Sequence, residues 1–423
     1  MTSPSVTREK PSFVMMVKPV GSLCNMRCDY CYYLDTAYED GRSSFLMTDD
    51  MLELFIRKYI EASAGPVVSF TWHGGEPAAC GIAFYEKVVK LQEKYLPEGF
   101  HAVNNLQTNG TLLDDAFCRF LAEHHFDVGL SIDGTRTVHD KVRHMADGSP
   151  SYDRSCAAIK RLLSYGIRPD LLCTVHKGTL PYAKAVYQAL RDFGTGWIQF
   201  IPIVNQEEGG ISADSITPEE YGEFLKDVFS AWFYHDLGKV NVQLFAETAK
   251  VLSGGSASVC TLAPTCGTVL VAEHDGSIYS CDHFVDHDHR LGNIAQDDLI
   301  SLLQSPDQQA FGRSKEEGLT EECRRCPYLS LCRGGCLKDR FALSSDGQSG
   351  HYYLCAGLKS FYDYAVPRLK EAMNLSSQHV PASRITDLLI QNERMRYAHV
   401  GRNDLCPCGS GRKFKSCCQR RVP

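Results

Sequence analysis

The sequence predicts an α/β protein whose parallel strands form either a partial (β/α)6 barrel or an open, doubly wound sheet. From Val14 to about Trp232, six segments rich in β-branched and aromatic residues alternate with segments of helical periodicity. A hydrophobic fraction of 43% and a charged fraction of 22% exclude a disordered chain. No apolar run reaches the roughly 20 residues that a membrane-spanning helix needs.

The expected strands are bounded by Gly, Pro or Asn and are Val14–Val20, Val67–Trp72, His101–Gln107, Asp127–Ile132, Leu171–Val175 and Trp197–Ile203. The expected helices between and after them are Asp49–Ala62, Ile82–Tyr95, Asp114–Glu123, Tyr152–Tyr165, Tyr182–Phe193 and Pro218–Trp232. Strand–helix alternation favours a parallel sheet. In such sheets, ligands bind at the carboxyl ends of the strands.

The pattern changes after about Gly238, where cysteines become frequent and helices shorten. We therefore expect a second domain that is held by metal rather than by a large apolar core. The predicted division is a leader at 1–12, a barrel at 13–237, a cysteine-rich domain at 238–370, a helical linker at 371–400 and a separate motif at 401–423.

Charge and cysteine content indicate the environment. A net charge of −7 over 423 residues argues against a nucleic-acid or acidic-membrane partner for the whole chain. The first 13 residues include Arg8 and Lys10 without a following apolar segment, so we expect a cytoplasmic protein without membrane contact. In that reducing compartment, 19 cysteines indicate metal ligation rather than disulfides.

The first cysteine group follows the first expected strand and consists of Cys24, Cys28 and Cys31, spaced C-x3-C-x2-C. Three thiolates can hold three irons of a [4Fe–4S] cluster and leave the fourth iron open. An open coordination position is what metal catalysis needs. The alternative interpretation is a structural zinc site that lacks its fourth ligand.

This motif resembles that of the radical S-adenosylmethionine (SAM) enzymes, which fold as partial (β/α)6 barrels. The resemblance extends to His73-Gly74-Gly75-Glu76-Pro77, where we expect the glycines to let the backbone approach SAM, and to Gln107–Gly110 and Gly129–Gly134. It implies that SAM binds the open iron and is cleaved to a 5′-deoxyadenosyl radical. The residues that would line SAM are Tyr30, Gly75, Ser131, Arg143 and Val204.

Eight further cysteines lie between residues 260 and 355, enough for two fully ligated clusters. The run Cys323-x2-Cys326-x5-Cys332-x3-Cys336 resembles the SPASM extension of radical SAM enzymes. The resemblance implies one auxiliary [4Fe–4S] cluster on Cys260, Cys266, Cys281 and Cys336, and an outer one on Cys323, Cys326, Cys332 and Cys355. A pair of structural zinc sites would use the same number of thiols.

The last 23 residues hold Cys406, Cys408, Cys417 and Cys418 together with six basic residues and one acidic residue. Two close thiol pairs suit one tetrahedral zinc ion, and the segment resembles the SEC-C motif. Its basic side chains could contact an acidic protein or the ribosome, or could belong to a solvated tail. These side chains are Arg412, Lys413, Lys415, Arg420 and Arg421.

From Phe13 to about Arg368 the chain resembles the anaerobic sulfatase-maturating enzymes, notably at Cys281–Phe284 and Arg290–Ile294. The resemblance implies oxidation of a cysteine or serine in a sulfatase to Cα-formylglycine. The expected base is Asp282, which follows cluster ligand Cys281 and is ionised at neutral pH; it could instead only cap a turn. Tyr33 and His73 are weaker candidates for substrate contact.

Two other functions fit parts of the same pattern. The first is a SPASM enzyme that makes thioether or carbon–carbon links in a ribosomal peptide, although only 23 residues precede Cys24. The second is a multicluster electron carrier or scaffold, which would need no open iron. For the sulfatase hypothesis, the expected partners are an unfolded or nascent sulfatase and a low-potential donor such as ferredoxin or flavodoxin. The resemblance also suggests a monomer.

Overall fold

The computed structural model describes residues 10, 12–34, 46–207 and 210–422, so the expected leader lies almost wholly outside the described residues. Six parallel strands are adjacent in the order β1–β3–β4–β5–β7–β8. They are β1 (Val14–Lys18), β3 (Val67–Trp72), β4 (His101–Thr108), β5 (Asp127–Ser131), β7 (Asp170–Val175) and β8 (Trp197–Pro202). All six lie where the sequence predicts strands.

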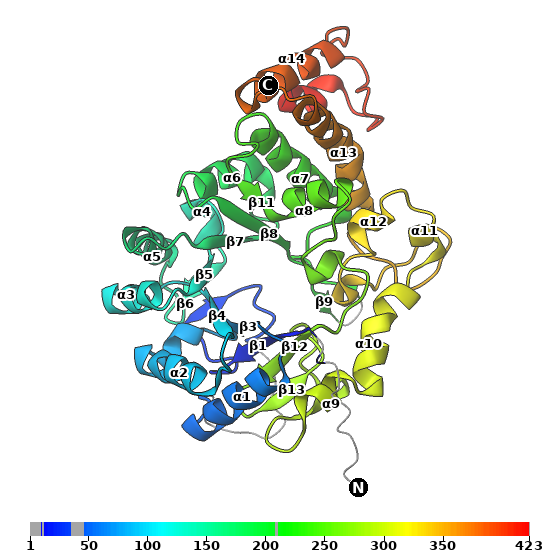
Figure 1. Cartoon of the computed structure of the whole chain (residues 1–423). Coiled ribbons are helices and arrows are strands. Elements are labelled where there is room, and N and C mark those ends of the chain that lie inside the picture. Colours follow the sequence, from blue (N-terminus) through cyan, green and yellow to red (C-terminus); the bar gives the residue numbers. More distant parts are fainter. Residues whose placement is uncertain (1–9, 11, 35–45, 208–209, 423) are drawn as a thin grey trace.

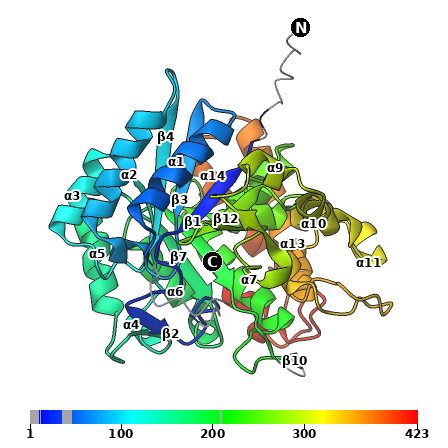
Figure 2. The ribbon, with the colours of Figure 1, turned by 90° about the horizontal axis from the view of Figure 1, so that it is seen from below.

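Helices follow these strands and cover the outer face of the curved sheet (Figures 1 and 2). The six expected helices are confirmed as α1 (Asp49–Ala62), α2 (Ile82–Tyr95), α3 (Asp115–Glu123), α5 (Tyr152–Ser164), α6 (Ala183–Arg191) and α7 (Pro218–Phe233). Their ends are set by local signals: Thr217 and Glu220 form a capping box at the start of α7, and Thr48 caps α1. The barrel-type α/β fold is therefore present.

The sheet continues on both sides of the six strands, with strands from beyond residue 237. On one side β11 (Asn241–Val242) pairs with β8. On the other side β12 (Val269–Glu273) pairs in parallel with β1, followed by the antiparallel strands β13 (Ser277–Tyr279) and β14 (Arg290–Asn293). The two predicted domains thus share a ten-stranded sheet.

The other elements are short, apart from α10 and the helices near the C-terminus. Two small antiparallel pairs join β2 (Met26–Cys28) to β6 (Arg143–Met145) and β9 (Gln206–Glu207) to β10 (Gly210–Ile211). The remaining helices are α4 (Arg136–His139), α8 (Gln243–Leu252), α9 (Leu299–Leu303), α10 (Pro306–Glu317), α11 (Glu321–Arg324), α12 (Leu329–Cys332), α13 (Cys355–Ser377) and α14 (Ala382–Arg396).

One hydrophobic core connects the barrel with the cysteine-rich part and extends from Phe13 to Leu389. Helix α13 packs against α7, and two glycines allow their backbones to touch. A Cβ atom at Gly357 would lie 1.8 Å from the carbonyl oxygen of Pro218, and one at Gly222 would lie 2.7 Å from the carbonyl oxygen of Gly357. The cysteine-rich part therefore packs against the barrel through apolar contacts.

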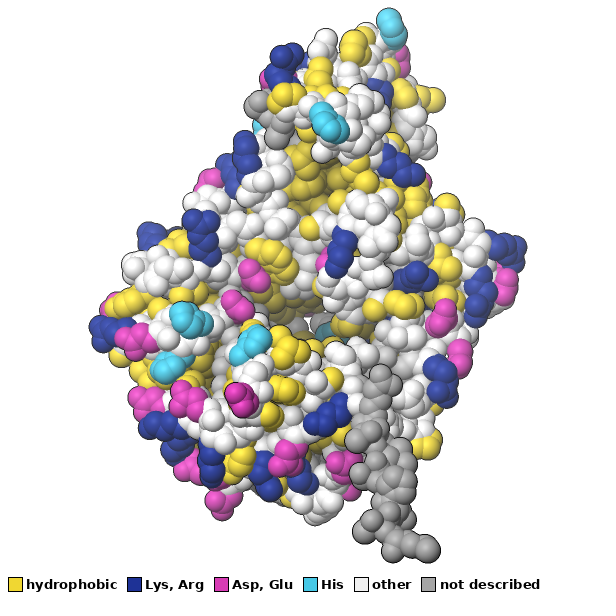
Figure 3. Space-filling view, viewed as in Figure 1, with side chains coloured by type: hydrophobic (Ala, Val, Ile, Leu, Met, Phe, Trp, Pro, Cys, Tyr) yellow, Lys and Arg dark blue, Asp and Glu magenta, His cyan; other side chains and the backbone are white. Residues whose placement is uncertain are grey.

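The surface mixes charges of both signs. On the face seen in Figure 3, Lys and Arg side chains alternate with Asp and Glu over the lower half. Within the described part of the chain, no helix is both long enough and apolar enough to cross a bilayer.

Candidate active site

The first cysteine loop lies directly after β1. The Sγ atom of Cys24 accepts a hydrogen bond from the backbone N–H of Met26 at 3.3 Å, and the Asn109 amide lies 3.8 Å from it. Burial raises the pKa of Cys24 to about 12 and that of Cys28 to about 11. A bound cation reverses that cost by stabilising the thiolates, so the loop suits a metal.

The geometry of the loop suits several irons better than one ion. Among the described residues, the thiols of Cys24, Cys28 and Cys31 do not form a group within 4.8 Å of one another. Ligands on different irons of a cluster are farther apart than ligands around a single ion. The three residues therefore fit the open [4Fe–4S] cluster of the sequence-based hypothesis.

The Gly-Gly-Glu-Pro turn after β3 packs directly against this loop. A Cβ atom at Gly75 would lie 2.1 Å from the carbonyl oxygen of Leu23, the residue before Cys24. The buried carboxylate of Glu76 accepts hydrogen bonds from Thr108 Oγ1 at 2.6 Å and from the Asn109 backbone at 2.8 Å. The glycine thus makes room for the cysteine loop, a role that the sequence did not predict, and Glu76 ties the turn to the end of β4.

A buried ion pair fixes two of the expected SAM-lining residues. Arg143 Nε donates to Asp133 Oδ2 at 2.8 Å, and Tyr30 Oη donates to the same oxygen at 2.6 Å. Burial works against ionisation of Asp133, but Arg143 and His139 outweigh it and lower the pKa to about 2. Arg143 also lies opposite Cys28 in the β2–β6 pair.

The other expected SAM-lining positions lie at the carboxyl ends of β5 and β8. The hydroxyl of Ser131 accepts a hydrogen bond from Gln107 Nε2 at 3.3 Å. Val204 is buried, and its carbonyl oxygen accepts a hydrogen bond from Lys338 Nζ at 3.1 Å. The ring of Tyr30 stacks on His176, whose centroid is 5.9 Å away. These positions lie at the carboxyl ends of the strands, where ligands bind in barrels of this kind.

The later cysteines gather in two sets. Burial raises the pKa of Cys281 to about 12, and the nearby thiols of Cys336 and Cys260 add to the effect. Cys266 interacts electrostatically with Cys260 in the same way. Arg340 lies near members of both sets and donates hydrogen bonds to three backbone carbonyls, those of Gly334, Lys315 and Arg333.

The second set surrounds a cavity of about 380 Å³. Four thiols line this cavity, those of Cys323, Cys326, Cys332 and Cys355. Burial raises the pKa of Cys332 to about 11 and that of Cys355 to about 12, and the neighbouring thiols add to both shifts. His351 also lines the cavity, and its Nδ1 lies 3.6 Å from the Sγ atom of Cys323. A cavity lined by four thiols fits a fully ligated cluster.

Asp282 lies in a charged network at the end of β1. Its Oδ1 is 2.6 Å from the Nζ atom of Lys18, and its Oδ2 accepts a hydrogen bond from the hydroxyl of Tyr32. Burial disfavours the carboxylate, but Lys18, His73 and His283 outweigh that cost and hold the pKa of Asp282 well below its ordinary range. Asp282 is therefore an ionised, precisely paired carboxylate.

Strand pairing brings Asp282 to this place. Lys18 is the last residue of β1 and lies beside Glu273, the last residue of β12. The β12–β13 hairpin then leads into a tight turn in which Cys281 and Phe284 form an isolated bridge, with Asp282 between them. Residues about 260 positions apart in the chain thus meet above the end of one strand.

The sequence did not predict two members of the network, Lys18 and Tyr32. Lys18 reads as part of a buried strand, and its side chain is fully buried. Tyr33, the expected substrate contact, is 4% exposed, and its hydroxyl donates to Glu273. Its neighbour Tyr32 is 50% exposed and contacts Asp282. His73 accepts a hydrogen bond from Gly74 at Nδ1, which leaves the proton on Nε2.

The C-terminal motif brings four thiols together. The Sγ atoms of Cys406, Cys408, Cys417 and Cys418 all lie within 4.8 Å of one another. Four thiolates around one zinc ion, with Zn–S bonds of about 2.3 Å, would be about 3.8 Å apart. The residues therefore fit a single tetrahedral zinc ion.

Three protein-family models match separate segments of the chain. The radical SAM superfamily model matches residues 19–181, an iron–sulfur cluster-binding domain model (SPASM) matches 247–327, and the SEC-C motif matches 402–420. The serine-type anaerobic sulfatase-maturating enzyme of Bacteroides thetaiotaomicron is 37% identical over 396 residues, 88% of this chain and 94% of that protein. The chain belongs to the anaerobic sulfatase-maturating enzymes. It has a radical SAM core and a SPASM domain.

Two further members of the family support this assignment. The cysteine-type anaerobic sulfatase-maturating enzyme of Clostridium perfringens (strain 13 / Type A) is 32% identical over 369 residues, 86% of this chain and 99% of that protein. The solved structure of native anSMEcpe with bound AdoMet and Cp18Cys peptide superposes with a TM-score of 0.79 at 32% identity, covering 86% of this chain and 99% of that one. Both substrate types therefore occur among similar proteins.

Proposed function

We propose that this sulfatase-maturating enzyme oxidises a cysteine or serine side chain of a sulfatase to Cα-formylglycine without oxygen, with Asp282 as the base. One observation carries the assignment of the base. Asp282 is a carboxylate with a 14% exposed side chain, it directly follows the expected cluster ligand Cys281, and Lys18 at 2.6 Å holds it ionised. A carboxylate in this state can accept the thiol or hydroxyl proton of a substrate at neutral pH.

The cysteines would hold the inorganic part of the site. When bound, the three [4Fe–4S] clusters and SAM supply a radical that removes a hydrogen atom from the substrate Cβ and an acceptor for the electron that follows. Cys24, Cys28 and Cys31 would hold the SAM-binding cluster. The ligands of the inner auxiliary cluster would be Cys260, Cys266, Cys281 and Cys336, and those of the outer one Cys323, Cys326, Cys332 and Cys355.

The remaining residues orient the reacting groups. Arg143 and Asp133 hold Tyr30 at the expected SAM site, with Ser131, Gly75 and Val204 around it. Lys18 and Tyr32 fix the two oxygens of Asp282 separately, so the carboxylate cannot rotate freely. The Nε2–H of His73 is available to donate to the substrate or to Asp282. Fixed donors of this kind cost no reorganisation during the reaction.

The partners and the location are part of the same proposal. The substrate would be an unfolded or nascent sulfatase segment, because the chemistry needs an extended peptide that can reach the Asp282 carboxylate. A low-potential donor such as ferredoxin or flavodoxin would deliver the reducing electron. The many free thiols fit the reducing cytoplasm. We propose that the enzyme acts there as a monomer.

A peptide assay tests this function. Reconstituted enzyme is incubated anaerobically with SAM, dithionite and a peptide that contains Cys-x-Pro-x-Arg, in parallel with its Ser counterpart. The proposal predicts the mass change from CH2–SH or CH2–OH to an aldehyde, which a hydrazine reagent then labels. SAM cleavage with a cross-linked product would instead indicate a peptide-linking enzyme. Clusters without SAM cleavage would indicate an electron carrier.

A further inference from the structure

The C-terminal motif has little apolar core of its own. Its buried cluster consists of Cys406, Phe414, Cys417 and Cys418, and Tyr397 stacks on Phe414 with a centroid distance of 5.1 Å. Three of these four buried residues are thiols. A segment this small needs a bound ion to hold its shape, because too little apolar surface is removed from water.

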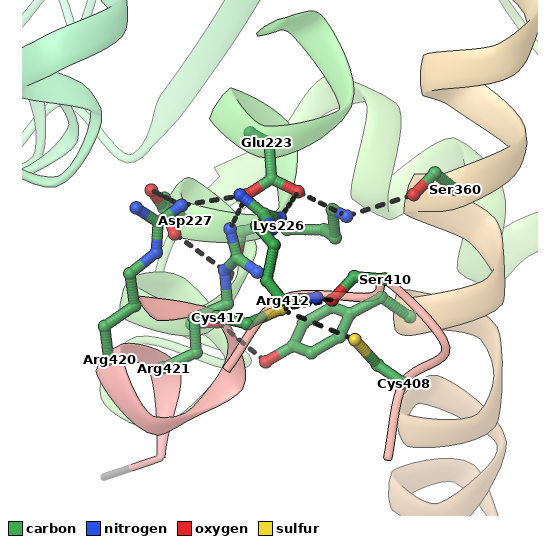
Figure 4. A network of polar contacts seen from close by, with 12 residues as sticks. Glu223, Lys226, Asp227, Ser360, Cys408, Ser410, Arg412, Cys417, Arg420 and Arg421 are labelled. Atoms are coloured by element: carbon green, nitrogen blue, oxygen red, sulfur yellow. Dashed lines mark hydrogen bonds and ion pairs between the residues drawn. The ribbon is translucent and has the colours of Figure 1, made fainter. Parts of the chain in front are cut away.

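Three arginines of the motif converge on two carboxylates of the barrel helix α7 (Figure 4). Arg421 Nε lies 2.7 Å from Asp227 Oδ1, and its Nη2 lies 2.8 Å from Glu223 Oε2. Arg420 Nη2 contacts the same two residues at 3.1 Å and 2.9 Å. Arg412 Nη2 reaches Glu223 Oε1 at 2.8 Å.

This contact is partly withdrawn from water. The side chain of Arg421 is 1% exposed, whereas those of Glu223 and Asp227 are 24% and 17% exposed. A guanidinium that contacts two carboxylates makes charge-assisted hydrogen bonds, and removal of the carboxylates would leave its buried charge unpaired. A hydrogen bond to the backbone adds to this attachment of the motif, because Lys184 Nζ on α6 donates to the carbonyl oxygen of Arg420 at 2.6 Å.

The same carboxylates also connect to α13. Lys226 Nζ lies 2.7 Å from Glu223 Oε1 and donates to Ser360 Oγ at 3.0 Å. The guanidinium of Arg421 lies 5.8 Å from the ring centroid of Tyr364 on α13. The motif therefore closes over the place where α7 and α13 cross.

The positions of the arginines in the sequence couple this contact to the thiols. Arg412 lies between the thiol pairs, and Arg420 and Arg421 follow Cys418 within the 3-10 helix Cys418–Arg421. A metal ion on the four thiols would fix the direction in which all three guanidinium groups point. An ordered partner surface would in turn tighten binding of the ion, because the coupling of the two binding free energies is reciprocal.

We propose that the C-terminal motif is a metal-dependent clasp whose binding partner is the Glu223–Asp227 pair of the same chain. Metal retention and closure of the clasp stabilise each other, and the clasp fastens the chain terminus to the barrel. This differs from the sequence-based expectation that the basic residues contact an acidic protein or the ribosome. Three of the five are engaged within the chain, and the side chains of Lys413 and Lys415 remain exposed.

The test compares two charge-removing double variants of the full-length, reconstituted enzyme. The first, called the receptor variant, combines Glu223→Gln with Asp227→Asn and removes the two carboxylates that the arginines contact. The second, a control, combines Lys413→Gln with Lys415→Gln and removes exposed charges of the same motif. Zinc release to a chelating dye and chymotrypsin cleavage between residues 378 and 423, at aromatic and Leu sites that neither variant alters, are followed over time. We expect both rates to rise about tenfold or more in the first variant and to stay unchanged in the second.

Two checks keep the result decisive. The first is the iron content of each variant, which shows whether the barrel and clusters are intact. The second, used if the receptor variant does not fold, measures the same two rates in the wild type at increasing salt concentrations. Screening by about 1 M NaCl should then accelerate zinc release and cleavage in the wild type. Rates that are equal in the wild type and the receptor variant, or indifferent to salt in the wild type, would overturn the proposal. So would a C-terminal motif that binds no zinc.

Discussion

Replacing Lys18 by Met should give the formation of formylglycine an acid limit that the wild type lacks. Lys18 Nζ lies 2.6 Å from Asp282 Oδ1, which corresponds to an attraction of about 6 kcal/mol at an effective dielectric constant of about 20. At about 1.4 kcal/mol per pKa unit, losing it would raise the pKa of Asp282 by up to about four units. The contacts of Tyr32 and His73 remain and reduce this rise.

The sign follows from the state of the carboxylate. In the wild type, the pKa of Asp282 is held well below its ordinary range, so this carboxylate is ionised at every usable pH. Without Lys18, burial favours the neutral acid, and we expect the pKa of Asp282 to rise above its ordinary range, toward the acid end of the assayed pH interval. The Lys18→Met enzyme should then lose product formation as the pH falls below about 6.

The assay measures formylglycine and 5′-deoxyadenosine in the same anaerobic reactions between pH 5.5 and 8.5. Cleavage of SAM should depend on pH in the same way in both enzymes, while the ratio of product to 5′-deoxyadenosine falls only in the variant. Lys18→Arg keeps the charge and should behave like the wild type. If the ratio in Lys18→Met is independent of pH, Lys18 does not control the ionisation of Asp282.

Three further changes follow from the contacts described. Gly75→Ala places a Cβ atom against the carbonyl oxygen of Leu23. Anaerobic reconstitution of this variant should therefore yield about four irons fewer than the roughly twelve expected. Gly99→Ala, where a Cβ atom meets nothing, is the control and should bind the normal amount of iron. Glu76→Ala leaves buried donors unpaired, and denaturant titration should show a loss of about 2–4 kcal/mol. The pKa of Asp133 is lowered to about 2, so its contribution to stability is complete above about pH 4 and disappears toward pH 2. Unfolding midpoints of Asp133→Asn should therefore change less than those of the wild type over that interval.

The strands and helices of the barrel were predictable because apolar residues recur along the sequence at the spacing that places them on the buried face of each element. The segment Val67–Trp72 and the helix Asp49–Ala62 occur with the predicted bounds. Each is a local pattern with its own turn or cap signals. The cysteine groups were equally local, since their spacing alone indicates thiolate ligation.

Long-range strand pairing could not be predicted in the same way. The strand β12 has five residues and β13 has three, too few to show a clear period, and their partner β1 lies at the other end of the chain. For that reason the sequence predicts a domain boundary at a place where the sheet continues. The pairing of Lys18 with Asp282 depends on this contact, so the sequence could suggest the carboxylate but not its cation.

Side-chain direction was a second gap. Tyr32 and Tyr33 are neighbours with the same chemistry, yet one contacts Asp282 and the other is buried against Glu273. Only the backbone path after Cys31 decides between them. Likewise, the composition of the C-terminal motif showed that it is basic, but not that Glu223 and Asp227 of α7 receive its arginines.

The most direct test of the central assignment is the ratio of formylglycine to 5′-deoxyadenosine in Asp282→Asn enzyme. With the wild type and the Cys-x-Pro-x-Arg peptide as reference, each reaction is analysed for both compounds by mass spectrometry. If Asp282 is the base, the variant cleaves SAM and keeps its full iron content but forms almost no aldehyde. An unchanged ratio in the variant would contradict that role.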